Sequence, residues 1–422
     1  MKKQTLAVLF GNRDFFPDAL VLEARKDIND LFKEFDINMI ALPQSATKNG
    51  SVETWEHSKE CAELFKKHRE EIEGVLVCMP NFSDEKGITD TLKLSGLDVP
   101  ILVQAYPDDP VNLPLDRRRD GFCGKISVCN NLRQYGYKYS LTTEHTTDPK
   151  CELFKEDFKK YLGVCRVVKG LRNMRVGAVG ARPNAFNTVR FSEKLLQHYG
   201  ISVKTIDLSE LFGKAWRMDD KNKDVQAKLH EIMNYIPTEG IPAEPLLRMA
   251  KFGLALDEWI TYHDLDATAL QCWDSIQVNL GINPCTLMSM MSEKLIPSAC
   301  EVDVTGAISM YALSLATGHP AALVDWNNNY AAETEKCIFF HCGNWAKSFY
   351  PDFTMRNAEI LATTLGEENT YGAINGRVPA GPMSYARITT DDVAGVIHAY
   401  AGDGMITDDP LETFGSRAVV EV

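Results

Sequence analysis

The chain has no long apolar run and no excess of positive charge. None of its apolar stretches reaches the roughly 18 residues that a membrane-spanning helix needs. With 45 Lys and Arg against 58 Asp and Glu, its formal net charge is −13, and the only dense basic cluster is Arg117, Arg118 and Arg119. Because proteins bind nucleic acid through clustered basic side chains, we expect neither a nucleic-acid partner nor a membrane-bound protein.

Several common site patterns are also missing. The 11 cysteines contain no CxxC pair, so we do not expect a structural zinc site. They are scattered through mainly apolar segments, which indicates reduced, buried thiols of a cytoplasmic protein. The segment VGAVGARP (176–183) lacks the GxGxxG spacing of a dinucleotide site. Gly11 to Asp14 interrupt the first apolar run, which therefore predicts a β-strand and no signal peptide.

A chain of 422 residues is too long for one hydrophobic core. Short β-rich runs alternate with helical patterns, as in GVLVCM at 74–79, and this order is typical of parallel sheets covered by helices. We predict an α/β protein with two tandem doubly wound, Rossmann-like domains, at 1–170 and 171–318, and a smaller β-rich C-terminal domain at 319–422. The last residues, SRAVVEV, suggest an unfinished strand, so we expect this third domain to be incomplete.

Two acidic residues, Glu301 and Asp325, occupy positions where carboxylates can act. Glu301 follows a small, Cys-containing segment and precedes a helix expected from about Thr305, and Asp325 is expected to close a short apolar strand. Open α/β sheets bind ligands at the ends of strands, beside helix N-termini. From the residues alone, each acid can be a helix cap, a structural ion pair or a functional carboxylate.

Two histidines could complete such a site. His341 ends the predicted strand KCIFFH, downstream of Asp325. A single histidine there can be purely structural, but two carboxylates with an imidazole suit a divalent cation such as Mn²⁺. His398, in the β-like run VIHAYAG, is expected to be a core residue. The alternative is that it serves as a further metal ligand.

The order of the segments VGAVGARP, NPC, ACEVDVTGA, HPAALVDW and FHCGNW resembles the L-fucose and L-arabinose isomerase family, in its short fucose isomerase-like branch. The resemblance runs from about residue 5 to the end. It implies a three-domain subunit that forms homotrimers or homohexamers, with active sites between neighbouring subunits. It also implies Mn²⁺, or another divalent cation, and the interconversion of aldoses and ketoses through an enediol.

Residue by residue, the resemblance implies that Glu301 and Asp325 are both catalytic residues and metal ligands. His341 resembles a metal-binding histidine of the arabinose branch. Relatives supply a further histidine from a late glycine-containing loop, which residues 400–422 do not contain. We expect that the sequence is cut short of this loop, with replacement by His398 or weak metal binding as alternatives.

We expect a substrate-binding role for four further residues: Arg13, Arg118, Asn344 and Trp345. Arg13 and the Arg117–Arg119 run either reach an anionic group of a modified sugar by bidentate hydrogen bonds or form subunit contacts.

The sequence thus predicts a metal-dependent aldose–ketose isomerase acting on a monosaccharide, without deciding which sugar or which carboxylate removes the C2 proton. The alternative is a non-catalytic sugar-binding or sensor protein, because tandem α/β domains with a crevice also suit that role.

Overall fold

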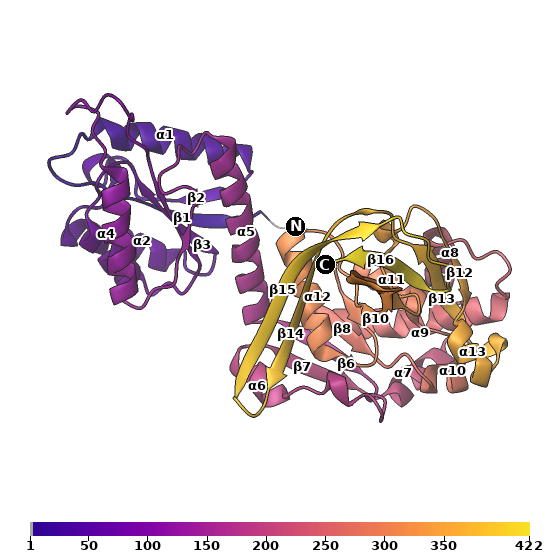
Figure 1. Ribbon diagram of the computed structural model, residues 1–422. Coiled ribbons are helices and arrows are strands. Elements are labelled where there is room, and N and C mark those ends of the chain that lie inside the picture. Colours follow the sequence, from indigo (N-terminus) through magenta and orange to yellow (C-terminus); the bar gives the residue numbers. More distant parts are fainter. Residues whose placement is uncertain (1–2) are drawn as a thin grey trace. The chain divides into compact units, whose positions relative to one another are not determined.

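The computed structural model describes residues 3–422. The chain divides into two compact units after Lys169 (Figure 1). The second unit holds both a parallel sheet and a β-rich sheet, so the predicted boundary after residue 318 between two separate domains stays a prediction.

The first unit is built on one five-stranded parallel sheet with strand order β2-β1-β3-β4-β5. Its strands are β1 (Thr5–Phe10), β2 (Asn38–Ile40), β3 (Gly74–Met79), β4 (Ile101–Ala105) and β5 (Ser140–Leu141). Its helices are α1 (Ala19–Glu34), η1 (Lys48–Gly50), α2 (Trp55–Lys67), α3 (Glu85–Ser95), α4 (Gly121–Gln134) and the start of α5 (Glu152–Arg172). The strand order reverses between β1 and β3, as in doubly wound sheets.

Helices cover both faces of this sheet, so its strands are apolar throughout. Leu6, Val8 and Phe10 of β1 pack against α1 and α5, whereas Ala7 and Leu9 pack against α2, α3 and α4. All five side chains are at most 1% exposed. This burial explains the continuous hydrophobic runs, which are typical of parallel sheets covered on both sides.

The second unit begins with a four-stranded parallel sheet of order β7-β6-β8-β9. Its strands are β6 (Arg175–Val179), β7 (Ser202–Ile206), β8 (Ala267–Leu270) and β9 (Ser298–Ala299). The helices are η2 (Asn187–Val189), α6 (Glu193–His198), α7 (Leu208–Arg217), α8 (Lys223–Tyr235), α9 (Ala243–Tyr262), α10 (Ser275–Leu280), α11 (Cys285–Glu293) and α12 (Val304–Thr317). Alternate residues of β8 again face different cores: Ala267 and Ala269 pack with α12, and Leu270 packs with α9 and α11.

A seven-stranded, mainly antiparallel sheet completes the second unit. Its strands are β10 (Asp325–Tyr330), β11 (Glu333–His341), β12 (Phe353–Asn357), β13 (Tyr371–Arg377), β14 (Gly381–Asp391), β15 (Val396–Thr407) and β16 (Ser416–Glu421), with η3 (Lys347–Phe349), α13 (Glu359–Leu365) and η4 (Glu367–Asn369) between them. The segment expected to be an unfinished strand forms β16, which pairs with β11, β13 and β15. Two parallel α/β sheets followed by a β-rich sheet confirm the predicted fold class.

Two local expectations are wrong. Asp325 does not close a strand: it begins β10, and residues 321–324 before it are irregular. The carbonyl of Leu323 accepts a hydrogen bond from the Trp345 indole at 2.6 Å, in place of a strand partner. His398 does not lie in a core, because its hairpin β14–β15 projects from the sheet (Figure 1); its side chain is 61% exposed, with Nε2 3.3 Å from the carboxylate of Asp391.

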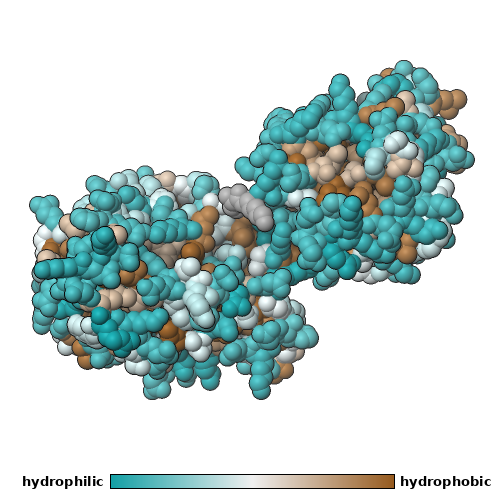
Figure 2. All heavy atoms as spheres, turned by 180° about the vertical axis from the view of Figure 1, so that it is seen from behind, coloured by the Kyte–Doolittle hydropathy of each residue, from teal (hydrophilic) through white to brown (hydrophobic). Residues whose placement is uncertain are grey.

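Among the described residues, no helix is both long and apolar enough to cross a membrane. Hydrophilic side chains cover most of the face in Figure 2, and hydrophobic residues gather in several patches between them, the broadest of which lies in the upper-right part of the view.

Lys125 of α4 supports a prediction about stability and pH. Its ammonium is buried and donates to the Thr142 hydroxyl at 2.6 Å, and burial lowers its pKa to about 8. The folded state therefore binds this proton less tightly than the unfolded state, so Lys125 destabilises the protein below pH 8, and this effect fades as the pH rises toward the ordinary lysine pKa.

We expect Lys125→Met to raise the free energy of unfolding at pH 7 and to lose most of this advantage at pH 10. Thr142 keeps a partner in the variant, because its hydroxyl also bonds the Glu144 carbonyl. Urea unfolding followed by circular dichroism measures the difference at both pH values, with Lys26→Met, at an exposed position of α1, as the control. An equal effect of Lys125→Met at both pH values would contradict the assignment.

Candidate active site

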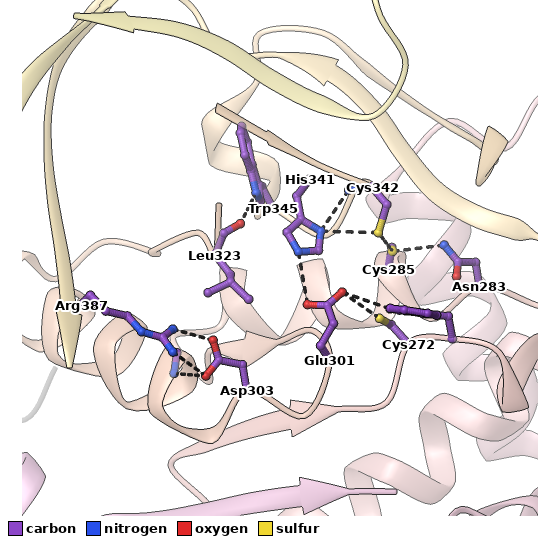
Figure 3. A network of polar contacts seen from close by, with 12 residues as sticks. Cys272, Asn283, Cys285, Glu301, Asp303, Leu323, His341, Cys342, Trp345 and Arg387 are labelled. Carbon is purple, nitrogen blue, oxygen red and sulfur yellow. Dashed lines mark hydrogen bonds and ion pairs between the residues drawn. The ribbon is translucent and has the colours of Figure 1, made fainter. Parts of the chain in front are cut away.

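Glu301 and His341 meet in the second unit, although they come from different layers. Glu301 lies in the loop between β9 and α12, and His341 is the last residue of β11. Their side chains face each other, with Nε2 of His341 3.7 Å from Oε2 of Glu301 (Figure 3). Both residues are buried, at 9% and 3% exposure. The fold thus holds an acid and an imidazole together in a buried position.

The backbone at Glu301 is strained. Glu301 and the next residue, Val302, have φ of 56° and 57°. Side chains clash with the backbone in this left-handed region, and a β-branched valine is especially disfavoured there. Strained backbone of this kind persists only where surrounding contacts impose it, and it gathers at functional sites.

An ion pair next to this turn supplies such contacts. Asp303 caps α12 by accepting the amide hydrogen of Gly306 at 2.8 Å. Arg387 of β14 donates to both oxygens of this carboxylate, at 2.5 and 3.0 Å, and to the Thr305 hydroxyl at 3.0 Å (Figure 3). A Cβ at position 306 would lie 2.5 Å from the Asp303 carboxylate, so the capping contact requires glycine. Arg387 thereby holds the residue that directly follows Val302.

The carboxylate of Glu301 has few strong hydrogen bonds. Its Oε1 accepts from the Cys272 thiol and from the Trp273 indole, both at 3.3 Å. The indole contact exceeds the usual length of about 2.9–3.0 Å, and a thiol is a weak donor. A nearly buried carboxylate with such weak compensation favours a positive group nearby.

Asp325 lies close enough for its charge to act on the other two residues. It pairs with Phe340, the residue before His341, across β10 and β11. Although the residue as a whole is exposed, desolvation raises the pKa of its carboxyl group; His341 lowers this pKa and Glu301 raises it. The structure therefore places Glu301 and His341 in contact and Asp325 within electrostatic reach of both.

Sequence reasoning missed a cluster of four thiols beside this site: Cys272, Cys285, Cys300 and Cys342, which we call the thiol cluster. Sγ of Cys342 lies 3.6 Å from Sγ of Cys285 and 3.5 Å from Nδ1 of His341. Hydrogen bonds from Cys285 and Cys300 lower the pKa of the Cys342 thiol well below its usual value. All four are free cysteines.

In the sequence, only the position of two cysteines directly beside Glu301 and His341 could have indicated this cluster. Cys300 precedes Glu301 and Cys342 follows His341, but no short spacing connects the four cysteines. Asp303 and Arg387 were also missed, since 84 positions separate them.

The two predicted arginines lie in the first unit and have partners there. Arg13 donates to the carbonyls of Phe82 and Ser83, at 2.9 and 3.1 Å, and its guanidinium lies over the Phe82 ring. Arg118 is paired with Asp120 at 2.9 Å, at the surface. Contact of either arginine with substrate stays a prediction.

Asn344 and Trp345 lie in the second unit, close in sequence to His341. Asn344 is only 2% exposed. Neither the oxygen nor the nitrogen of its side-chain amide has a hydrogen-bond partner in the described part of the chain. Such an unsatisfied buried amide is uncommon and suits a bound polar group or water. Trp345 uses its indole N–H on the Leu323 carbonyl, so its ring can offer only an apolar surface.

That surface borders a cavity of about 820 Å³, which α12, residues 320–326 and the β14–β15 hairpin enclose. Leu323, Trp326 and Trp345 line it, whereas Glu301, Asp325 and His341 do not. The cavity therefore adjoins the segments that carry Glu301, Asp325 and His341 without being lined by these side chains.

The matching family models and the similar proteins agree with one another. Residues 7–172 match a model described as fucose/sulfoquinovose isomerase, N-terminal domain, and residues 339–422 match L-fucose isomerase, C-terminal domain. Three sulfoquinovose isomerases are similar: those of Priestia aryabhattai (25% identity over 252 residues), Alkalicoccus urumqiensis (25% over 257) and Clostridium sp. strain MSTE9 (27% over 238).

These alignments cover 59%, 61% and 55% of this chain and 54%, 56% and 51% of the relatives. The chain thus spans about half the length of the curated relatives it matches.

The Arg387–Asp303 pair can be tested by a double-mutant cycle. Arg387→Met leaves the carboxylate of Asp303, which is 3% exposed, without its charge partner. We expect a loss of about 3 kcal/mol in the free energy of unfolding, as for a broken buried ion pair. Asp303→Asn keeps an oxygen for the helix cap, so the double variant should lose less than the sum of the single changes.

Tryptophan fluorescence during urea unfolding reports mainly on this unit, because five of the six tryptophans follow residue 170. Arg356→Met, at an exposed position of β12, is the control. Strict additivity of the two single changes would show that the pair is not coupled.

Proposed function

Because the chain belongs to the fucose isomerase-like family, we propose that it is an aldose–ketose isomerase acting on a monosaccharide. The observation that carries this proposal is the buried contact between Glu301 and His341, with Asp325 within electrostatic reach. Two carboxylates and an imidazole that influence one another electrostatically can move protons between neighbouring carbon and oxygen atoms of a sugar.

We also propose that Glu301, Asp325 and His341 hold a divalent cation such as Mn²⁺. The donor set fits, because carboxylate and imidazole ligands suit this ion. The weakly compensated carboxylate of Glu301 and the desolvated carboxyl of Asp325 would both gain from a nearby positive charge. When bound, the cation would act as a Lewis acid that polarises the substrate carbonyl.

The side chains themselves would perform the proton transfers. In the aldose-to-ketose direction, one carboxylate removes the C2 proton to form an enediol, and the proton is returned to C1. The other carboxylate moves a proton from O2 to O1. His341 orients the Glu301 carboxylate through the 3.7 Å contact.

For the substrate, we propose an aldose, with sulfoquinovose as the first sugar to assay, because the relatives carry that name. In this proposal the protein is cytoplasmic and forms a homotrimer or homohexamer in which subunits share active sites. Arg13 and Arg118 would then bind the sugar or its anionic group, and Asn344 and Trp345 would contact the sugar from the second unit. A panel of aldoses, 6-deoxyaldoses and 6-sulfoaldoses, assayed with Mn²⁺, tests the choice of substrate.

Replacement of Glu301 by glutamine tests the acid–base assignment. The change keeps the size of the side chain and removes its charge, so we expect kcat to fall by about 10²–10⁴-fold while the fold is retained. Turnover of the best sugar in the panel measures the effect, and circular dichroism checks the fold. Glu244→Gln, at an exposed surface ion pair, is the matched control. Near wild-type isomerisation by Glu301→Gln would overturn the assignment.

Thermal unfolding tests the metal proposal separately. A cation that binds only the native state, and whose concentration is 100 times its Kd, stabilises the protein by about 2.7 kcal/mol. We therefore expect Mn²⁺ to raise the Tm of EDTA-treated protein, with a smaller rise in Glu301→Gln and Asp325→Asn. Asp391→Asn, in the β14–β15 hairpin, should retain the full effect. An unchanged Tm in the wild type would count against the cation, as would an equal rise in all variants.

A further inference from the structure

The thiol cluster places two groups of three potential metal ligands side by side. The ligand atoms of Cys300, His341 and Cys342 all lie within 4.8 Å of one another, and the same holds for Cys272, Cys300 and Glu301. Cys300 belongs to both groups. Cys272 and Cys300 are at most 1% exposed, and Cys342 is partly buried. Sulfur donors therefore lie directly beside Glu301 and His341.

We infer that Cys300, Cys342 and His341 form a binding site for a thiophilic divalent cation such as Zn²⁺ or Cd²⁺. Thiolate and imidazole ligands select such soft ions, whereas Mn²⁺ prefers oxygen donors. In a tetrahedral zinc site, Zn–S distances are about 2.3 Å and Zn–N distances about 2.0–2.1 Å. Ligand atoms within 4.8 Å of one another need only a modest inward movement to meet these distances.

The ring of His341 faces the two kinds of donor with different nitrogens. Its Nε2 faces Glu301, and its Nδ1 lies 3.5 Å from Sγ of Cys342 (Figure 3). Nδ1 also accepts the amide hydrogen of Cys342 at 3.0 Å, and this hydrogen bond would give way to the cation. The two thiols would lose their protons to solvent on binding, so two thiolates balance the charge of the ion.

A further thiol, that of Cys285, lies next to Cys342, and the ligands sit in packed parts of the chain. Sγ of Cys285 lies 3.6 Å from Sγ of Cys342, and the Asn283 amide donates to Cys285 at 3.2 Å. Cys300 directly precedes the strained turn at Glu301, and His341 ends β11. The cysteines and the histidine thus come from three segments of the chain: the start of α11, the residue before the turn at Glu301, and the adjacent pair at the end of β11.

A soft cation at this site would compete with the proposed Mn²⁺. His341 would be a ligand of both ions. Cys300 also lies in a second group of potential ligands, which contains Glu301. Zn²⁺ would therefore hold the acidic site in a form that does not accept the hard cation. Binding itself does not depend on isomerase activity, so spectroscopy can test it even if the proposed function is wrong.

Titration of EDTA-treated, reduced protein with Cd²⁺ tests the inference directly, because cadmium bound to thiolate has an ultraviolet charge-transfer absorption. We expect one equivalent of Cd²⁺ to saturate the band in the wild type, and Cys300→Ala and Cys342→Ala to lose at least half of it. Cys61→Ala, buried in the first unit, and Cys123→Ala, at an exposed cysteine, should keep the full band.

A full band in Cys300→Ala and Cys342→Ala would overturn the inference, as would its loss in Cys123→Ala. X-ray absorption of the zinc-loaded wild type needs no variant and so remains informative if a substitution prevents folding. We expect at least two sulfur neighbours and one nitrogen neighbour around zinc. A shell of oxygen and nitrogen alone would contradict the site.

Discussion

The acidic site depends on one ion pair that it does not itself contain. Arg387 reaches from β14 to the carboxylate of Asp303, which in turn caps α12. The preceding residues, Glu301 and Val302, adopt a left-handed backbone that neither side chain favours. Strain of this kind is stable only when the following residue is fixed, and the pair fixes it from a strand of another sheet. The β-rich sheet thereby decides where the α/β sheet presents its carboxylate.

The same loop explains why the site combines so many reactive groups. Once Glu301 is turned inward, its carboxylate lies 3.7 Å from the imidazole of His341 and 3.3 Å from the Trp273 indole and the Cys272 thiol. The carboxylate therefore keeps unused capacity to bind a cation. Cys300, one position earlier, belongs to the thiol cluster, so one short segment carries both a hard oxygen donor and a soft sulfur donor.

The first unit has a different relation to the proposed chemistry. Its doubly wound sheet holds Arg13 after β1, and this arginine already bonds two backbone carbonyls. Arg118 likewise has an acidic partner at the surface. A role for either residue in sugar binding would require these contacts to be exchanged for contacts with substrate. In the second unit, by contrast, Asn344 has buried polar atoms without partners, so it could bond a ligand at no such cost.

Local pattern was sufficient for much of this protein. The sequence alone predicted the strand at 74–79 and the α/β class, because a sheet covered on both faces needs continuous apolar runs. It also selected Glu301 and His341, which the structure brings into contact.

Only the tertiary structure decided the rest. Asp325 begins a strand where the sequence suggested an end, since Leu323 bonds Trp345 and no strand partner. The exposure of His398 depends on a hairpin that projects from its sheet. The thiol cluster and the Arg387–Asp303 pair join segments 57 and 84 positions apart. Periodicity describes neighbours along the chain, whereas these contacts arise where helices and loops pack against the β-rich sheet, which no local pattern encodes.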